Sequence, residues 1–544
     1  MRNFSGLIGR FGKDRRGNIA VIFAIACIPL MSAVGCAVDY SMATRMKAKL
    51  QSAADAATVA SISQRSAGYV AAAAMTSDGS IPAGVTDAQA IFDGNMNTIT
   101  GYQNLARTST VTKTGIKLVS NMTFSADVPV TFLKVMGYTV LTVTGSSKSS
   151  ASLPPYLDFY LTLDVSGSMG LPSTPAEAVR MQSINPDNHV QYPTGCTLAC
   201  HFAPQNSACT DAGTQRYRTN NYCMGYIYSR LSQSALSTLI NQASTVSVPK
   251  TQRPGLPTSM LTHLNNVVTP GASNSLLTGN SASTPQSLTA ATSCPTDGTD
   301  ACIQLRLDAV GYAVNQLLAT ANSKEILTNQ FRIGIYPFIQ SLNANYFPLT
   351  TSINGNPATS GTLNYAAANL ALLLDTNMDA NLGSGGTHID NALHTMNTVI
   401  TSVGNGSASS NTLPYVFLVT DGAQDPQTKG VPNGSWAGSN HATTLDNASN
   451  SFPTACATLK GRGIIVSVLY IPYQTISPVN ASFAGDEDDA ANNNIANIPA
   501  SLSGCASPPD AGGSYFYTAS SPAEIQNSLN AMFNHSLQTA HITN

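Results

Sequence analysis

Two hydroxyl residues follow an aspartate at alternate positions, directly after a run of apolar residues. The motif Asp-x-Ser-x-Ser occupies residues 164–168, and residues 156–163 before it have the pattern of a buried strand. Alternate side chains of an extended segment point to the same side, so Asp164, Ser166 and Ser168 can converge on one point beyond the strand. One carboxylate and two hydroxyls form part of a shell of hard oxygen ligands, which suits Mg²⁺ or Mn²⁺. This segment is therefore a candidate site for a divalent cation.

Two more oxygen-bearing side chains occur later in the chain in comparable settings. Thr387 lies in a Gly-Gly-Thr-His-Ile segment that precedes a helical pattern over residues 390–400. Asp421 follows a second buried-strand pattern over residues 415–420. With the first motif they would supply two carboxylates and three hydroxyls. Because hydroxyls donate weakly, a bound Mg²⁺ would keep coordination positions for water or a ligand.

The order of these pieces resembles that of a von Willebrand factor A (VWA) domain. On this resemblance, the five positions of the family's metal-ion-dependent adhesion site are matched by Asp164, Ser166, Ser168, Thr387 and Asp421. The resemblance implies that Mg²⁺, or Mn²⁺ in its place, binds here and leaves one coordination position for an acidic side chain of a protein partner. The alternative is a Ser-rich turn and an unrelated Thr-Asp-Gly turn, which would have to match several ordered pieces by coincidence.

The rest of the C-terminal half alternates between strand and helix patterns. Helical patterns cover residues 303–320 and 521–533, and apolar strand patterns cover residues 331–338, 463–470 and 514–518. Such alternation predicts an α/β, Rossmann-like fold with a doubly wound, mostly parallel sheet that is covered on both faces. We assign residues 156–544 to this domain and expect its ligands at the carboxyl ends of the strands.

A long insertion, residues 171–300, separates the first motif from the first helix of this domain. It is rich in Ser, Thr, Asn and Pro, and with its exit it contains Cys196, Cys200, Cys209, Cys223, Cys294 and Cys302. Exported proteins usually bridge their cysteines, so we expect three local disulfides, and Cys456 is a candidate partner for Cys505. A zinc site built from the first four cysteines and His201 is the alternative. Because the insertion begins beside Ser168, we expect it to flank the cation and to restrict which partner can approach.

The first 40 residues have the pattern of a basic head and a membrane-spanning helix. The head, residues 1–16, carries five basic residues and one acid, and residues 18–38 carry no charge. At 1.5 Å per residue, this uncharged stretch covers about 31 Å, enough for the core of a bilayer. We expect a transmembrane helix over residues 17–40, with the head in the cytoplasm and the bulk of the chain outside. A cleaved signal peptide is the alternative, but the uncharged run is long and continues into a helix without a break.

Residues 41–66 continue the helical pattern, and residues 67–155 are predicted to form a strand-rich stem. The helix has an apolar seam of small residues at spacings of three and four: Ala43, Met46, Leu50, Ala53, Ala57 and Ala60. Small residues let helices approach closely, so the seam predicts either self-association or packing against its own domain. In the stem, strand patterns cover residues 116–120, 128–133 and 138–143, and the Ser-rich residues 146–155 have the composition of a linker.

Three segments near the N-terminus, residues 14–24, 37–40 and 49–57, resemble in order and spacing the start of the TadG-like proteins of the bacterial tight-adherence (Tad, or Flp) pilus machinery. The resemblance implies a single-pass protein of the bacterial inner membrane, with a cytoplasmic N-terminus and a periplasmic or surface-directed bulk. It also implies a role in assembling or anchoring a Tad/Flp pilus, with a pilus-assembly component as the partner.

The composition and the site argue against two other classes of protein. A formal net charge of −2 and a charged fraction of 10% do not fit a protein that binds nucleic acid. No nucleophile and base stand together near the motif, and His388 is interpreted as a surface or capping residue, so no enzyme is predicted and a metal-dependent hydrolase ranks last. A metal-dependent surface adhesin or matrix-binding receptor unrelated to pili is the alternative function.

Overall fold

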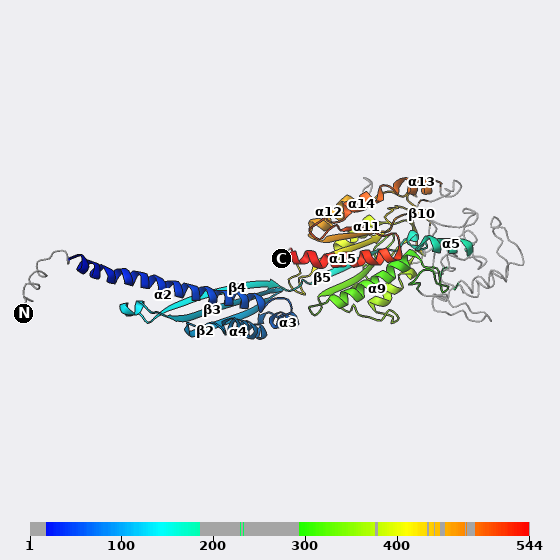
Figure 1. The fold of residues 1–544 in the computed structure, drawn as a ribbon. Helices are drawn as coiled ribbons and strands as arrows, with labels where there is room; N and C mark the ends of the chain where they lie inside the picture. The colour runs from blue at the N-terminus through cyan, green and yellow to red at the C-terminus, as the bar shows by residue number, and fades with distance from the viewer. Residues whose placement is uncertain are drawn as a thin grey trace, which may run out of the picture. The chain divides into compact units, whose positions relative to one another are not determined.

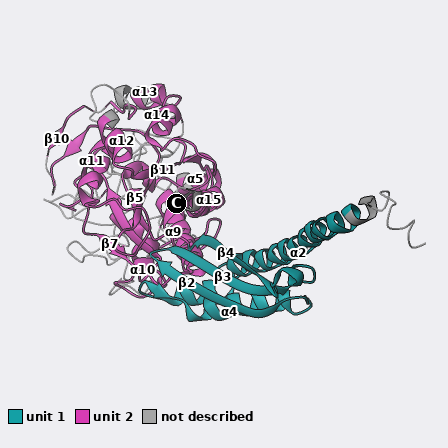
Figure 2. Cartoon of the chain, turned by 90° about the vertical axis from the view of Figure 1, so that its left-hand side faces the viewer, with its two compact units in different colours: residues 1–153 teal, residues 154–544 magenta. Residues whose placement is uncertain are grey.

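The computed structural model of the chain describes residues 18–184, 229, 232, 293–375, 379–431, 435–439, 441–445, 452–473, 475 and 485–542. The chain divides into two compact units, Met1–Leu153 and Pro154–Asn544 (Figure 2). The basic head and most of the insertion lie outside the described residues, so what the sequence predicts for them stays a prediction.

Unit 1 is a four-stranded antiparallel sheet packed against helices (Figure 1). Its strands, in sheet order, are β1 (Gly79–Ser80), β2 (Gln103–Thr114), β3 (Lys117–Pro129) and β4 (Val140–Ser152). Its helices are α2 (Asn18–Ala60), α3 (Ala67–Ala74) and α4 (Pro82–Met96). Side chains of β3 alternate between buried and more exposed, as expected for a sheet with one covered face. Leu50 of α2, Phe92 of α4 and Met122 of β3 meet in the core.

Helix α2 has two halves that face different surroundings. Residues 22–38 leave most of their large apolar side chains exposed, and the helix is long and apolar enough to cross a membrane. The second half belongs to the core of unit 1, and the seam residues buried there are Ala43, Met46, Leu50, Ala53 and Ala57. Of the two uses predicted for the seam, packing against its own domain is therefore the one observed in unit 1.

The stem differs from its sequence-based expectation in two places. Residues 67–96 contain the helices α3 and α4, because a run of alanines favours α3 and Pro82 suits the first turn of α4. The Ser-rich residues expected to form a linker belong to β4 as far as Ser152. Their pairing with β3 satisfies the backbone hydrogen-bonding groups, which outweighs the composition.

Unit 2 is built on a six-stranded sheet. The strands, in sheet order, are β12 (Phe516–Thr518), β11 (Ile465–Tyr470), β8 (Leu413–Thr420), β5 (Leu157–Asp164), β6 (Phe331–Phe338) and β7 (Phe347–Thr350). All neighbours pair in parallel except β7, which is antiparallel to β6. All eight residues of β5 are buried, so both faces of the sheet are covered. The predicted α/β fold with a mostly parallel sheet is confirmed.

Helices and one small ribbon surround this sheet (Figure 1). The helices are α5 (Pro175–Ile184), α9 (Arg306–Lys324), α10 (Leu363–Ala368), α11 (Ile389–Val399), α12 (Phe452–Gly461), α13 (Gly485–Asn494), α14 (Ile498–Cys505) and α15 (Pro522–Ile542). The ribbon consists of β9 (Thr428–Lys429) and β10 (Trp436–Ala437). Helix α9 is the first helix that the sequence predicts after the insertion.

Two disulfides are formed among the described residues. Cys456 pairs with Cys505, as the sequence suggests, and joins α12 to α14. Cys294 pairs with Cys302, which is one local bridge at the exit of the insertion. The remaining cysteines of the insertion, and with them the zinc alternative, lie outside the described residues. Cys27 and Cys36 are free thiols in the apolar half of α2.

We predict that Phe159→Ala will unfold unit 2 more easily than a surface truncation will. The Phe159 ring contacts Phe331, Tyr415, Phe417 and Phe533, with ring centroids 5.2–6.1 Å away, and so joins the central strand to α15. Removing a buried phenylalanine typically costs about 3–5 kcal/mol of unfolding free energy. Denaturation followed by the fluorescence of the single tryptophan, Trp436 of unit 2, measures this cost.

Ile326→Ala is the matched control, because Ile326 is 47% exposed. It should change the unfolding free energy by no more than about 0.5 kcal/mol. Equal losses in the two variants would contradict the central position assigned to Phe159.

Candidate metal centre

The two aspartates of the predicted site lie at the same edge of the unit 2 sheet. Strands β5 and β8 are parallel neighbours in which Leu163 pairs with Val419, so Asp164 and Asp421 stand at the carboxyl ends of adjacent strands. Both are buried, with 1% and 0% of their surface exposed. Parallel pairing thus brings together two carboxylates that are far apart in the sequence.

Asp164 is held by three hydrogen bonds. The Ser166 N–H and hydroxyl donate to Asp164 Oδ1 at 3.0 and 2.6 Å, and the Thr420 hydroxyl donates to Oδ2 at 2.6 Å. Thr420 also accepts a hydrogen bond from the Gly422 N–H at 3.0 Å. Thr420 was not predicted as a site residue, because its only signal in the sequence is its position directly before Asp421. These bonds fix the orientation of the Asp164 carboxylate.

Ser168 connects the two aspartates. It lies in a short 3-10 turn, Gly167–Gly170, that follows β5. Its hydroxyl oxygen is 3.4 Å from that of Ser166, and it is close enough to Asp421 to pull down the pKa of that carboxyl. Four of the five predicted residues, Asp164, Ser166, Ser168 and Asp421, therefore form one cluster.

Asp421 faces an arginine that the sequence analysis did not select. Arg306 is the first residue of α9 and is 4% exposed, and its Nη1 lies 3.5 Å from Asp421 Oδ2. The other oxygen, Asp421 Oδ1, is buried and receives no hydrogen bond of acceptable geometry from the described residues. A buried carboxylate oxygen without a donor is costly. A cation bound next to Asp421 Oδ1 would therefore offset this cost most directly.

Burial favours the protonated forms of both aspartates, and repulsion from Asp421 adds to this effect at Asp164. Burial, together with the charge of Asp421, raises the pKa of Asp164 to about 7. Burial also raises the pKa of Asp421, against the opposing attraction of the Arg306 guanidinium. A divalent cation between two such groups would stabilise their ionised forms.

Thr387 lies in a loop that is tied to the loop after β8. The Thr387 N–H donates to the Asp425 carbonyl at 3.0 Å, and the Asp425 N–H donates to the Thr387 carbonyl at 2.9 Å. The preceding Gly386 has a φ of +63°, and a Cβ there would lie 2.4 Å from the Asp425 oxygen, so only glycine permits this approach. Thr387 is buried, and these two backbone hydrogen bonds tie it to the loop that follows Asp421.

His388 is the N-cap residue of α11, and one nitrogen of its ring lies 3.0 Å from the Gln427 carbonyl oxygen. Its side chain makes no capping hydrogen bond to α11, so His388 occupies the N-cap position through its backbone alone.

The donor set fits a hard divalent cation. It consists of two carboxylates and neighbouring hydroxyls, which are ligands that Mg²⁺ and Mn²⁺ accept. Within the described part of the chain, no three His, Cys, Asp or Glu side chains group closely enough to hold a metal.

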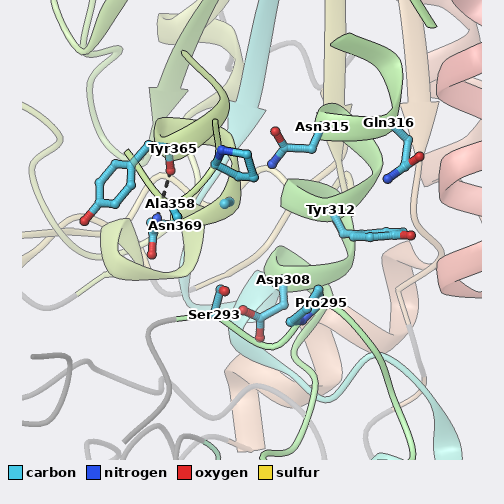
Figure 3. Close-up of a pocket in the computed structure, with 11 residues that line it drawn as sticks. Ser293, Pro295, Asp308, Tyr312, Asn315, Gln316, Ala358, Tyr365 and Asn369 are labelled. Atoms are coloured by element: carbon cyan, nitrogen blue, oxygen red, sulfur yellow. Dashed lines mark hydrogen bonds between the residues drawn. The ribbon is translucent and has the colours of Figure 1, made fainter. Parts of the chain in front are cut away.

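A separate cavity of about 540 Å³ lies beside α9 and α10 (Figure 3). Its lining residues include Tyr312, Tyr365 and Asp308. Asp308 accepts hydrogen bonds from the N–H groups of Cys294 at 3.2 Å and Leu305 at 2.9 Å, and so caps the start of α9. Among the described lining residues, the titratable side chains are those of Asp308, Tyr312 and Tyr365.

Residues 17–74 match the sequence family described as "Putative Flp pilus-assembly TadE/G-like". The match confirms the resemblance seen in the N-terminal segments. No curated protein sequence matches the chain.

Three solved structures are similar to this chain at low sequence identity. The pilus adhesin SpaC from Lactobacillus rhamnosus GG is 11% identical over 82% of this chain, with a TM-score of 0.29, and this chain spans 36% of its length. A variant of the PilB minor pilin from Streptococcus sanguinis is 9% identical over 81% of this chain and 80% of its own, with a TM-score of 0.31. The von Willebrand factor domain of the type V pili tip protein Mfa5 from Porphyromonas gingivalis is 14% identical over 44% of this chain and 89% of its own, with a TM-score of 0.24.

We expect unit 2 to lose stability as pH rises when a chelator keeps it free of metal. The pKa of Asp164 is about 7 in the folded state, whereas an unfolded aspartate titrates near 3.9. The folded state therefore holds a proton that the unfolded state has lost, and stability falls as that proton leaves. The thermal midpoint reported by Trp436 should drop between about pH 4 and pH 7, the unfolded and folded pKa values, and level off above that range.

Asp164→Asn is the control, because an amide does not titrate and removes the like-charge repulsion. This substitution should flatten the dependence on pH. A wild-type midpoint that rises over the same range, or that falls equally in the variant, would contradict the assignment.

Proposed function

We propose that this chain is a membrane-anchored Tad/Flp pilus assembly or anchoring protein whose unit 2 binds a protein partner through a divalent cation. The match of residues 17–74 to the TadE/G-like family supports the connection to pili. The observation that carries the binding role is the buried pair of Asp164 and Asp421, in which one oxygen of Asp421 has no donor among the described residues.

The cation would be Mg²⁺ or Mn²⁺, held by Asp164, Ser166, Ser168, Thr387 and Asp421. When bound, it would supply a Lewis-acidic point to which a carboxylate of the partner could coordinate. The chain's own contribution is positioning: Ser166 and Thr420 orient Asp164, and the parallel pairing of β5 with β8 holds both aspartates at adjacent strand ends.

Arg306 supports the choice of an acidic partner. A divalent cation would balance the two carboxylates, and the buried Arg306 guanidinium would then leave the loaded site with one positive charge. A net positive charge in a low-dielectric site is unfavourable until an anion approaches. An acidic side chain is therefore a better final ligand than a neutral carbonyl or amide.

The N-terminal helix is proposed to remain in the mature protein. Helix α2 runs without interruption from its apolar half into the core of unit 1. Asp39, directly after the uncharged stretch, is 2% exposed and bonded within the unit. Cleavage after the small residues near Gly35 would leave the new N-terminus next to these contacts, which favours a retained anchor over a signal peptide.

Metal binding is predicted to depend on Asp164. At a Mg²⁺ concentration about 100 times the dissociation constant, a site present only in the folded state adds about 2.7 kcal/mol to the unfolding free energy. Asp164→Ala should abolish this gain and the heat of Mg²⁺ binding in calorimetry while the fold stays intact. Asp489→Ala removes an exposed carboxylate and should leave both unchanged. Unaltered Mg²⁺ affinity in Asp164→Ala would show that the site is assigned wrongly.

Topology is predicted from the basic head. A reporter that is active only in the periplasm should be active when it is fused after Asn544, and an epitope tag placed before Arg2 should stay in the membrane fraction. Release of a shorter soluble chain would support the signal-peptide alternative. Activity of a cytoplasmic reporter at Asn544 would contradict the orientation.

A further inference from the structure

The loop that joins β3 to β4 exposes large apolar side chains. We call residues 130–139 the tip loop; it contains the 3-10 turn η2, Leu133–Met136. Its exposed fractions are 49% for Phe132, 83% for Val135, 61% for Met136 and 57% for Tyr138. Connections between antiparallel strands are normally made of small and polar turn residues. A cluster of exposed apolar side chains at such a position indicates an interaction surface.

The tip loop is fixed to the helix that is proposed to span the membrane. The Asp39 carboxylate accepts hydrogen bonds from the N–H groups of Thr131, Phe132 and Leu133 at 2.9, 2.8 and 2.7 Å. These three bonds tie the start of the loop to the first charged residue after the uncharged part of α2. The start of the loop is therefore fixed beside Asp39, at the C-terminal end of the uncharged part of α2 (Figure 1).

The loop also contacts residues within the uncharged stretch of α2. A Cβ on Gly35 would come within 2.5 Å of Phe132 Cβ, so the absence of a side chain at Gly35 makes room for the ring. The Cys36 sulfur lies 3.9 Å from the Met136 sulfur. Gly35 is three residues before Val38, a distance of about 4.5 Å along a helix. Interfacial segments bury their apolar faces about 5–10 Å into the boundary between headgroups and acyl chains.

The apolar surface of the tip loop continues that of α2. Ile28, Met31 and Val34 are exposed by 69%, 67% and 61%, and so require lipid or another cover. Tyr40 is 70% exposed just beyond the uncharged stretch, where tyrosines commonly meet the headgroups. Lys134 stands in the same loop and can extend its charge toward water while its stem stays apolar.

We propose that the tip loop is a second membrane contact, which inserts Phe132, Val135, Met136 and Tyr138 into the outer leaflet beside α2. This inference rests on the proposed anchoring of the chain by α2. Its occupant is lipid, because the loop extends the surface that α2 itself offers to lipid. Attachment at two points would hold the sheet of unit 1 at a fixed orientation to the bilayer, which a single helix alone cannot do.

Quenching of a single tryptophan by brominated acyl chains tests the proposal. The full chain is reconstituted in vesicles of phosphatidylethanolamine and phosphatidylglycerol, and Trp436→Phe removes the only native tryptophan. In this background we compare Val135→Trp in the tip loop, Ile28→Trp in α2 and Thr114→Trp. Thr114 is exposed and is the last residue of β2, where it pairs with Lys117 at the start of β3. It therefore lies at the end of β3 that is remote from the tip loop.

The proposal predicts that brominated lipid removes most of the emission of Val135→Trp and Ile28→Trp and leaves that of Thr114→Trp unchanged. Quenching of Ile28→Trp without quenching of Val135→Trp would overturn the tip-loop contact and leave the anchor standing. A blue-shifted but unquenched Val135→Trp would assign the loop to a protein partner instead, which also overturns the proposal. Quenching at neither Ile28 nor Val135 would overturn the anchor and the tip-loop contact together.

Discussion

Repulsion between two buried carboxylates is the constraint on which the proposed site depends. The parallel register of β5 and β8 places Asp164 and Asp421 at one sheet edge, out of contact with water. Like charges at low dielectric cannot both ionise without compensation. Hydroxyls from Ser166 and Thr420 stabilise Asp164, and Arg306 offsets part of the charge of Asp421. Asp421 Oδ1 receives no hydrogen bond from the described residues, so its negative charge is not fully compensated. A bound cation would supply the missing positive charge.

A third carboxylate organises unit 1 in a different way. Asp39 marks the end of the uncharged stretch of α2, and it holds the tip loop through three backbone N–H groups. One residue thus defines both where the apolar half of the helix stops and where the sheet is attached to it. Because α2 is also part of the core of unit 1, anchoring and folding of this unit share one helix.

The local parts of this structure could be predicted from the sequence, and the long-range parts could not. Apolar runs that end in Asp164 and Asp421 define β5 and β8, since a buried strand and its polar end are contiguous in the chain. Arg306 and Thr420 were not selected, because their contacts cross between elements far apart in the sequence. The Ser-rich end of β4 was assigned to a linker because composition alone does not reveal its pairing with β3. The same limit applies to Asp39, whose partners lie about ninety residues further along the chain.

The central claim, a divalent cation held between the two strand ends, is tested most directly by anomalous diffraction. Crystals of the protein grown with Mn²⁺ would be measured on both sides of the manganese absorption edge. A cation bound at this site would give one strong anomalous peak between Asp164 and Asp421, with the hydroxyls of Ser166 and Ser168 among its nearest oxygens. Ordered carboxylates with no anomalous peak between them at saturating Mn²⁺, or a peak only at other residues, would contradict the claim.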